Sequence, residues 1–254
     1  MAKGWRRDRQ VRCGPVASRT GERTLRFAGG WARVGPWHDQ PDVAHVVVAT
    51  DQRLSPPAVR DCVARVRAAG YRAAVTSPLT AAAAVPFLSE GFESREHLHV
   101  LEHPLTDLAR RSGAGPELRR GWRRDRVEVI ALDRRAFPPD WRLGDSGLRE
   151  ALRATPSVRF RVAHRPGDPR IAAFAITGRA GRQGYLQRLA VHPDAQRGGL
   201  GRALVVDSLR WVRRSGGRTC LVNTQTDNQD ALALYEACGF RRLPSGLGVL
   251  GCAW

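Results

Sequence analysis

A glycine-rich string between two periodic segments is the first feature of this sequence that can do chemistry. Consecutive small residues let a chain bend so that several backbone N–H groups point into one concavity, and a helix that starts there adds its positive N-terminal end. Such a cradle suits a diphosphate, although glycine-rich turns without any ligand are also common. The string, which also offers two guanidinium groups, consists of Gln196, Arg197, Gly198, Gly199, Leu200, Gly201 and Arg202.

Two further strings flank this cradle. Upstream, Leu189, Ala190 and Val191 end an apolar run and are followed by a histidine and a proline. Downstream, Asn228 stands at the expected start of a helix that carries Tyr235 and stops at a glycine. Asparagine is favoured at a helix N-terminus in any case, because its side chain caps free backbone N–H groups. Its presence there is therefore weak evidence of function.

Together, the three strings resemble the GNAT superfamily of N-acyltransferases. Gln196, Gly199 and Gly201 match the acyl-coenzyme A motif Q/R-x-x-G-x-G/A, and the segment from Asn228 onward matches N-x-x-A-x-x-x-Y-x-x-x-G-F. The matches occur in the right order and at ordinary distances, and the resemblance covers residues 126–254. A relic that binds nothing is the alternative, since a fold alone does not prove activity.

The resemblance implies a strand that splays away from its neighbour and leaves a gap for the pantetheine arm of acetyl-CoA, the co-substrate. Backbone groups of Leu189 and Val191 would pair with that arm as though a strand were added. A backbone N–H would polarise the thioester carbonyl, and an amine would attack it directly, without a covalent enzyme intermediate. The implied co-substrate residues are Leu189, Ala190, Val191, Gln196, Arg197, Gly198, Gly199, Leu200, Gly201, Arg202, Asn228 and Ala231.

By the same resemblance, Tyr235 is the expected catalytic residue. A phenol at this place lies near the coenzyme sulfur and protonates the departing thiolate, a good leaving group that needs only modest assistance. The alternative is a helix tyrosine that packs its ring and leaves its hydroxyl in water.

The general base is where the sequence departs from the simplest family pattern. Many members carry a glutamate on the equivalent strand, whereas residues 185–188 read YLQR, without a carboxylate. Either deprotonation of the amine runs through ordered water held by groups such as Gln187 and Asn223, or the base lies elsewhere. Asp227 is a candidate, although it also suits the start of a helix. The sequence leaves these alternatives open.

Alternating strand and helix signals must position these residues. Helical spacing of apolar residues predicts helices at 199–215 and 227–237. The expected fold is α/β: a complete C-terminal GNAT fold whose mixed central sheet has splayed strands and is flanked by helices. Apolar runs bounded by turn residues predict its strands at 127–132, 158–163, 171–177, 185–191, 220–223, 240–243 and 247–252.

The same order of elements recurs, damaged, in the N-terminal half. The distance from Gly70 to Gly91 nearly equals that from Gly216 to Gly239, which indicates an internal duplication. The repeat predicts strands at 46–48 and 72–76, helices at 58–69 and 80–89, and further strands from residue 91. The expected organisation is a basic flexible tail (1–26), a truncated, degenerate GNAT-like unit (27–108), an arginine-rich linker (109–125) and a catalytic GNAT domain (126–254).

The N-terminal copy departs from the motif at each chemical position. Residues 52–57, QRLSPP, stand where the glycine cradle stands, and prolines lack the N–H donors that a cradle needs. Thr80 replaces the asparagine, and Phe87 replaces Tyr235. We therefore expect a structural or substrate-shaping unit that lacks its early strands and leans on the C-terminal domain. The tandem layout resembles mycothiol synthases, but the shorter N-terminal unit gives no reason to carry over their substrate.

Composition limits the partners. The net charge of +18 comes almost wholly from arginine, so the protein attracts anions and disfavours a strongly cationic substrate. No apolar run approaches the roughly 20 residues that span a bilayer, and the N-terminus lacks the apolar stretch of a secretory signal. We therefore expect a cytoplasmic protein without a membrane partner. Its reduced thiols would be Cys13, Cys62, Cys220, Cys238 and Cys252.

Two weaker signals point elsewhere. His97, His99 and His103 alternate as a strand would present them, but histidines on surface strands are far commoner than metal ligands, so no metal is expected. The arginine-rich segments could contact RNA, yet no interleaved aromatic motif accompanies them. Nucleic acid is therefore not the expected partner, and nothing in the sequence indicates the oligomeric state.

The function predicted is transfer of an acetyl group from acetyl-CoA to a primary amine of a small molecule or a peptide N-terminus. Two alternatives stay open. One is a non-catalytic acetyl-CoA-binding sensor or partner module, and the other is a basic RNA- or ribosome-associated protein on a GNAT scaffold. The acceptor pocket is expected to involve residues 133–154, the turn at 244–246 and the N-terminal unit.

Overall fold

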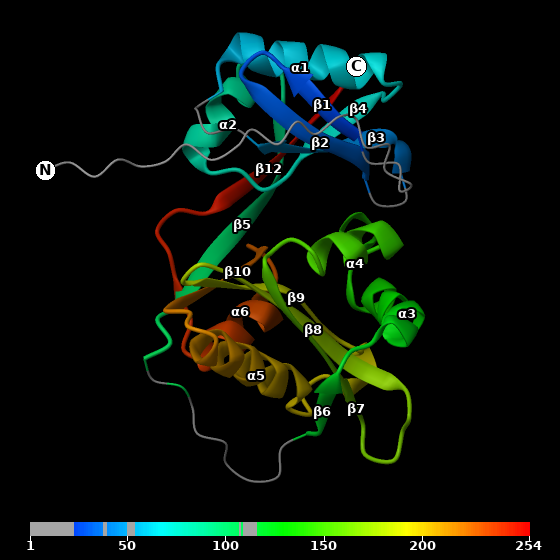
Figure 1. Cartoon of the computed structure of the whole chain (residues 1–254), viewed down its shortest axis with the longest axis vertical. Coiled ribbons are helices and arrows are strands. Elements are labelled where there is room, and N and C mark those ends of the chain that lie inside the picture. Colours follow the sequence, from blue (N-terminus) through cyan, green and yellow to red (C-terminus); the bar gives the residue numbers. More distant parts are fainter. Residues whose placement is uncertain (1–22, 38–39, 50–53, 107, 109–115) are drawn as a thin grey trace, which may run out of the picture.

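A computed structural model describes residues 23–37, 40–49, 54–106, 108 and 116–254. Within these residues, 12 strands form one continuous mixed sheet, and helices pack against it (Figure 1). The strand order is β1-β2-β3-β4-β12-β5-β10-β9-β8-β7-β6, and the short β11 pairs with β5 off this path. The sequence-based expectation of a mixed α/β sheet is confirmed.

The N-terminal unit is a meander of three antiparallel strands followed by a strand parallel to the third. Its first two strands correct the expectation that this unit lacks its early strands, and residues 23–26 belong to the first of them rather than to a tail. Residues 1–22 of the expected flexible tail lie outside the described residues. The elements are β1 (Arg23–Phe27), β2 (Gly30–Trp37), β3 (Gln40–Ala49), α1 (Pro56–Ala68), β4 (Ala73–Thr76), α2 (Ala81–Leu88) and β5 (Glu93–His103).

The C-terminal unit repeats this plan with two additional helices near its start. The hairpin expected after residue 157 is present as β7 and β8. Single 3₁₀ turns cover Arg123–Asp125, Pro139–Trp141 and Pro193–Ala195. The remaining elements are β6 (Leu118–Arg120), α3 (Arg126–Ala136), α4 (Asp145–Ala151), β7 (Ser157–His164), β8 (Ile171–Ala180), β9 (Gln183–Val191), α5 (Leu200–Arg214), β10 (Thr219–Gln225), α6 (Gln229–Ala237), β11 (Arg241–Arg242) and β12 (Leu247–Ala253).

The strand predicted at 127–132 is wrong, because these residues lie in helix α3. Val129, Leu132 and Asp133 are buried three and four residues apart, as one face of a helix requires, whereas Val127 is 81% exposed. A strand would have buried alternate residues instead. The strand that opens the C-terminal unit is β6, inside the segment expected to be a linker, of which residues 109–115 are outside the described part.

The two units exchange their last long strands. Strand β5 leaves the N-terminal unit and pairs antiparallel with β10 of the C-terminal unit, from Leu98 to His103. Strand β12 runs the other way and pairs with β4 of the N-terminal unit as well as with β5 (Figure 1). Leu101 of β5 is fully buried in the C-terminal core. Each unit therefore completes its sheet with a strand from the other.

The internal repeat extends to side-chain packing. Phe87 at the end of α2 packs edge-on against Phe92, with ring centroids 5.2 Å apart. Tyr235 at the end of α6 contacts Phe240 at the same sequence separation, with ring centroids 5.7 Å apart and the rings tilted by 57°. In both units the residue before that phenylalanine is a glycine with positive φ, 85° and 93°. In the described residues, the N-terminal unit has no counterpart of α3 and α4, so it is the shorter copy.

The strand exchange predicts that the units unfold together. Truncating Leu101 to alanine removes buried apolar contacts from the C-terminal core and should lower the free energy of unfolding by about 2–5 kcal/mol. Chemical denaturation followed by tryptophan fluorescence and circular dichroism should show one shifted transition. Glu93→Ala, an exposed position on the same strand, is the control and should shift stability by less than about 0.5 kcal/mol. Two separate transitions, with only that of the C-terminal unit shifted, would contradict this coupling.

Candidate functional site

Strands β9 and β10 part from each other after a short parallel pairing. They pair only where Gln183–Tyr185 faces Thr219–Leu221, although both strands continue well beyond these residues. The equivalent strands of the N-terminal unit, β3 and β4, stay paired along the whole of β4, and Ser77 N continues the ladder to Val46 O. In the described part of the chain, β9 and β10 therefore part early, whereas β4 stays paired along its full length.

The backbone of β9 directs hydrogen-bonding groups into this opening. His192 N donates to Ala172 O at 2.8 Å, so this pair is hydrogen-bonded to β8. Hydrogen-bonded and non-bonded pairs alternate along antiparallel strands, so Ala190 bonds to β8 as well. Leu189 and Val191, the alternate residues, direct their N–H and C=O groups toward the edge that faces β10. This is the arrangement that the family resemblance implied.

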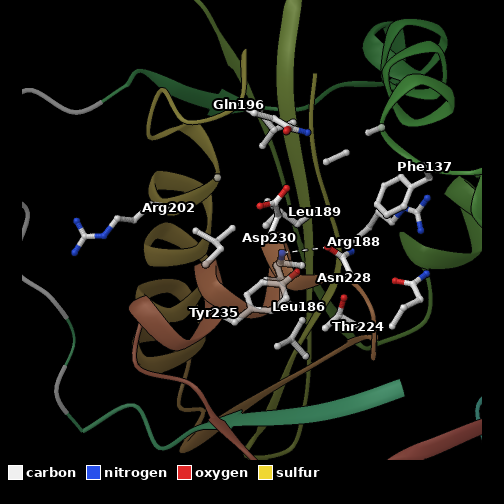
Figure 2. Close-up of a pocket in the computed structure, with 18 of the residues that line it drawn as sticks. Phe137, Leu186, Arg188, Leu189, Gln196, Arg202, Thr224, Asn228, Asp230 and Tyr235 are labelled. Carbon is white, nitrogen blue, oxygen red and sulfur yellow. Dashed lines mark hydrogen bonds between the residues drawn. The ribbon is translucent and has the colours of Figure 1, made fainter. Parts of the chain in front are cut away.

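A pocket of about 670 Å³ fills the opening; we call it the β9–β10 pocket (Figure 2). Two sequence-predicted residues lie outside its lining: Gly198, in the loop, and Leu200, which is buried in the core beneath the loop. The other predicted residues line it: Leu189, Ala190, Val191, Gln196, Arg197, Gly199, Gly201, Arg202, Asn228, Ala231 and Tyr235.

The predicted cradle has the backbone that its glycines suggest. Gly199 adopts φ = +81° at the N-cap of α5, a conformation that side chains disfavour, and it has no side chain to cap the helix. The first-turn N–H groups of α5 are thus left for an external acceptor. A Cβ on Gly201 would lie 3.1 Å from Leu234 and 3.5 Å from Val191, so that glycine allows close packing of α5 against α6 and β9.

Tyr235 points from α6 into the same pocket, beside Leu186 (Figure 2). Its side chain is only 6% exposed. Burial raises the pKa of the Tyr235 phenol above its usual range, and the positive charge of Arg188 offsets this only in part. The hydroxyl is therefore a stable proton donor at neutral pH. Asn228 caps α6 by accepting from Ala231 N at 3.1 Å, as its position predicted.

An ion pair that sequence reasoning missed forms the opposite wall of the pocket. Arg188 of β9 binds the fully buried Asp133 of α3 through two hydrogen bonds, at 2.7 and 2.8 Å. It also donates to Trp141 O at 2.6 Å and lies over the ring of Phe137. Asp133 in turn accepts from Leu143 N at 2.7 Å. This network ties α3 and the following turn to β9, and recognising α3 as a helix would have exposed Asp133 as a buried carboxylate.

The groups considered for deprotonating the amine lie in different places in the structure. Gln187 and Asn223 both line the pocket, so the route through ordered water is geometrically available. Asp227 is exposed and is not among the residues that line the pocket; the residue that caps α6 is Asn228. The structure thus favours Gln187 and Asn223 over Asp227 as groups near the reaction.

The N-terminal copy is closed at both equivalent places. Its helix α1 starts at Pro56, and the Ser55 side chain accepts from Ala58 N at 3.4 Å, so the helix caps itself. Thr80 caps α2 in the same way, and Phe87 is 2% exposed in the core. Residues 52–53 of the compared string lie outside the described part of the chain. The N-terminal unit therefore has an aromatic pair at the same place as the C-terminal unit, but the start of its helix α1 is capped and does not form a cradle.

The remaining expectations concern metals, thiols and membranes. Among the described residues, no group of three histidine, cysteine or acidic side chains is arranged to hold a metal ion. Cys62, Cys220, Cys238 and Cys252 are free thiols, and Cys13 lies outside the described part. Burial raises the pKa of Cys220 to about 12, which makes it unreactive. No helix in the described ranges has the length and apolarity to cross a bilayer.

Comparison with known proteins agrees with this geometry. A model of the acetyltransferase (GNAT) family matches residues 126–240. A mycothiol acetyltransferase of Saccharomonospora viridis is 34% identical over 132 residues, which cover 46% of this chain and 42% of that protein. The [ribosomal protein bS18]-alanine N-acetyltransferase of Escherichia coli K12 is 41% identical over 71 residues, 28% of this chain and 48% of that protein. The matches thus span less than half the length of these curated relatives.

Solved structures share the fold of both units. A tandem GNAT protein from the clavulanic acid biosynthesis pathway superposes with a TM-score of 0.64 at 14% identity, covering 88% of this chain and 78% of that one. A GCN5-related N-acetyltransferase from Kribbella flavida gives 0.63 at 14% identity, covering 91% and 89%. The family model thus matches the unit that holds the open strand edge, and residues 126–240 are similar to the acetyltransferase domain of the GNAT family.

Proposed function

We propose that the C-terminal unit transfers the acetyl group of acetyl-CoA to a primary amine of a small molecule or a peptide N-terminus. The observation that carries the proposal is the coincidence, in one pocket, of an unpaired strand edge, an uncapped helix N-terminus and a buried phenol. The helix end suits the diphosphate, the strand edge suits the amides of the pantetheine arm, and the phenol suits the sulfur.

The residues fit acetyl-CoA in chemistry as well as shape. Arg197 and Arg202 border the helix end and add positive charge for phosphate groups. Leu189 and Val191 offer backbone donors and acceptors at the spacing of an added strand. We assign the co-substrate to this pocket, with its diphosphate at the turn where Gly199 adopts a positive φ.

The reaction balances without further cofactors. The lone pair of the neutral amine attacks the thioester carbon, an N–C bond forms and the C–S bond breaks. The sulfur leaves as a thiolate and takes the phenolic proton of Tyr235, while the amine proton passes to water held near Gln187 and Asn223. A proton from water restores the phenol. The products are an amide and free CoA.

The names of the relatives cover a small molecule and a ribosomal protein, so they support both acceptor classes. A binding module without turnover is the second candidate, and the position of Tyr235 in the pocket weighs against it. We propose the cytoplasm as the compartment, because the described cysteines are free thiols.

Replacing Gly199 with glutamate tests the cradle. The new carboxylate would stand at the helix end meant for phosphate, and the position requires φ = +81°. We expect the Kd of acetyl-CoA, measured by calorimetry, to rise by at least about tenfold, or about 1.4 kcal/mol. Gly216→Glu is the matched control, since Gly216 lies at the other end of α5 with φ = +91° and open space around it. Equal affinity of both variants and the wild type would exclude the cradle.

Replacing Tyr235 with phenylalanine tests the proton donor. The ring packing against Phe240 is kept and only the hydroxyl is removed. We expect kcat for CoA release to fall by about 100-fold or more while acetyl-CoA affinity stays unchanged. Tyr185→Phe, at an exposed tyrosine of β9, should leave kcat unchanged. An unaltered kcat in Tyr235→Phe would remove this residue from the chemistry.

The pH profile offers an independent check on the phenol. Because burial raises the pKa of Tyr235 above its usual value, the group stays protonated beyond the pH at which free tyrosine ionises, about 10. Rising pH also increases the fraction of neutral amine. We therefore expect kcat/KM for the amine to rise from pH 7 and to show no loss below about pH 10. A fall between pH 8 and 9 would contradict a raised Tyr235 pKa.

A further inference from the structure

A second pocket lies between the two units, and we call it the inter-unit pocket. It has a volume of about 440 Å³, which suits a small molecule. One wall comes from strands β2 and β3 of the N-terminal unit, and the other comes from α4 and the residues beside it (Figure 1). No residue of the GNAT motifs contributes to it.

Gln187 is the residue that lines both pockets. It is the extra residue of a bulge in β9, since the register with β8 passes from Leu186 opposite Thr177 directly to Arg188 opposite Ile176. A bulge re-aims a side chain relative to the regular strand. A second junction is formed by Trp37 of the inter-unit pocket and Trp141 of the β9–β10 pocket, whose rings meet edge-on at 6.5 Å. The two pockets are therefore neighbours across these residues.

The side chain of Gln187 is closely packed, but one of its polar atoms lacks a hydrogen bond. A Cβ on Gly178 would lie 2.5 Å from Gln187 Nε2, so the glycine of β8 makes room for the amide. Gln187 Oε1 is buried and finds no hydrogen-bond partner among the described residues. A buried acceptor without a donor costs about 1–3 kcal/mol, so a well-placed amide of this kind calls for a donor from outside the chain.

The lining of the inter-unit pocket indicates what kind of molecule could supply the hydrogen-bond donor for Gln187 Oε1. Val34, Val47 and Leu143 make much of the wall apolar, and Trp37 adds an aromatic face against His45 at 5.0 Å. Within the described lining, the carboxylate is Glu150, which already pairs with Arg33 at 3.2 Å. A polyamine would need several carboxylates that this lining does not offer. A compound with one amine and an apolar body fits better.

We propose that the inter-unit pocket binds the acceptor and that this acceptor is a small monoamine with an apolar, alkyl or aryl, body. The Gln187 amide turns toward the pocket when the amine binds, so that Oε1, which is buried in the free protein, accepts a hydrogen bond from the amine nitrogen. The lone pair of that nitrogen points into the β9–β10 pocket toward the thioester. The body rests between β2–β3 and α4. The inference relies on the proposed acetyl transfer and adds the substrate class, the second pocket and a role for Gln187 in positioning the amine.

The test measures release of free CoA from acetyl-CoA with a panel of apolar monoamines, including 2-phenylethylamine and hexylamine, beside spermidine and a synthetic peptide with an N-terminal alanine. We expect turnover with one or more monoamines and little with spermidine. Gln187→Leu should raise KM for the active monoamine about tenfold, the loss expected for a buried hydrogen bond to an amine, and leave KM for acetyl-CoA unchanged.

Two further variants control for folding and for the location of the site. Ser146→Phe, at an exposed position of α4 that lines the inter-unit pocket, should raise the KM of the monoamine without destabilising the core. Gln183→Leu lies on the same strand as Gln187 but lines neither pocket, and it should leave both KM values within about twofold.

Failure of this inference is distinguishable from failure of the proposed function. The inference is overturned if no monoamine is turned over, if spermidine or the peptide is the better acceptor, or if Gln187→Leu and Ser146→Phe leave the KM of the amine unchanged. In each of these cases acetyl-CoA binding, measured by calorimetry, would still stand. Absence of acetyl-CoA binding itself would instead overturn the proposed function.

Discussion

The parting of β9 from β10 is the constraint on which the rest of the site depends. The strands separate after three residue pairs, and Leu189 and Val191 are left with backbone groups that no strand satisfies. Water can satisfy them in the free protein, and an extended ligand can replace that water. The bulge at Gln187 bends β9 near the point of separation, and the Arg188–Asp133 pair holds the bent strand against α3. Breaking this buried pair would leave a charge without compensation, at a cost of about 3–5 kcal/mol.

The N-terminal unit explains by contrast what the site requires. Its strands β3 and β4 stay paired, Ser55 caps α1, and a phenylalanine stands where the C-terminal unit has a tyrosine. It nevertheless supplies β5 to the C-terminal sheet and one wall of the inter-unit pocket. The N-terminal unit therefore completes its neighbour, both as a strand donor and as one wall of the inter-unit pocket.

Local sequence signals predicted the motif elements well. They did not predict the pairing of strands that lie far apart in the sequence. The turn at Gly199 and the Asn228 cap of the helix that carries Tyr235 were predictable because these local structures depend on neighbours within one turn or one loop. Helix α3 was mistaken for a strand because Val127, Val129 and Ile130 have high strand propensity, while tertiary packing selects Val129 and Leu132 as a helical face. Strand β6 is three residues long, and the exchange of β5 and β12 depends on partners far apart in sequence. In the sequence, the segment that contains Arg188 stood out only because it lacks a carboxylate. The ion pair was missed because the partner of Arg188, Asp133, lies 55 residues away.

Hydrogen exchange of individual amides, measured with and without saturating CoA, reports on the open strand edge itself. We expect slower exchange for the amides of Leu189 and Val191 and for those at the start of α5, because the ligand accepts hydrogen bonds from both places. Amides of residues 44–46 in β3, a segment paired on both sides, should be unaffected. If CoA binds while the amides of Leu189, Val191 and the first turn of α5 exchange at unchanged rates, the ligand does not bind along the open edge of β9 and at the start of α5.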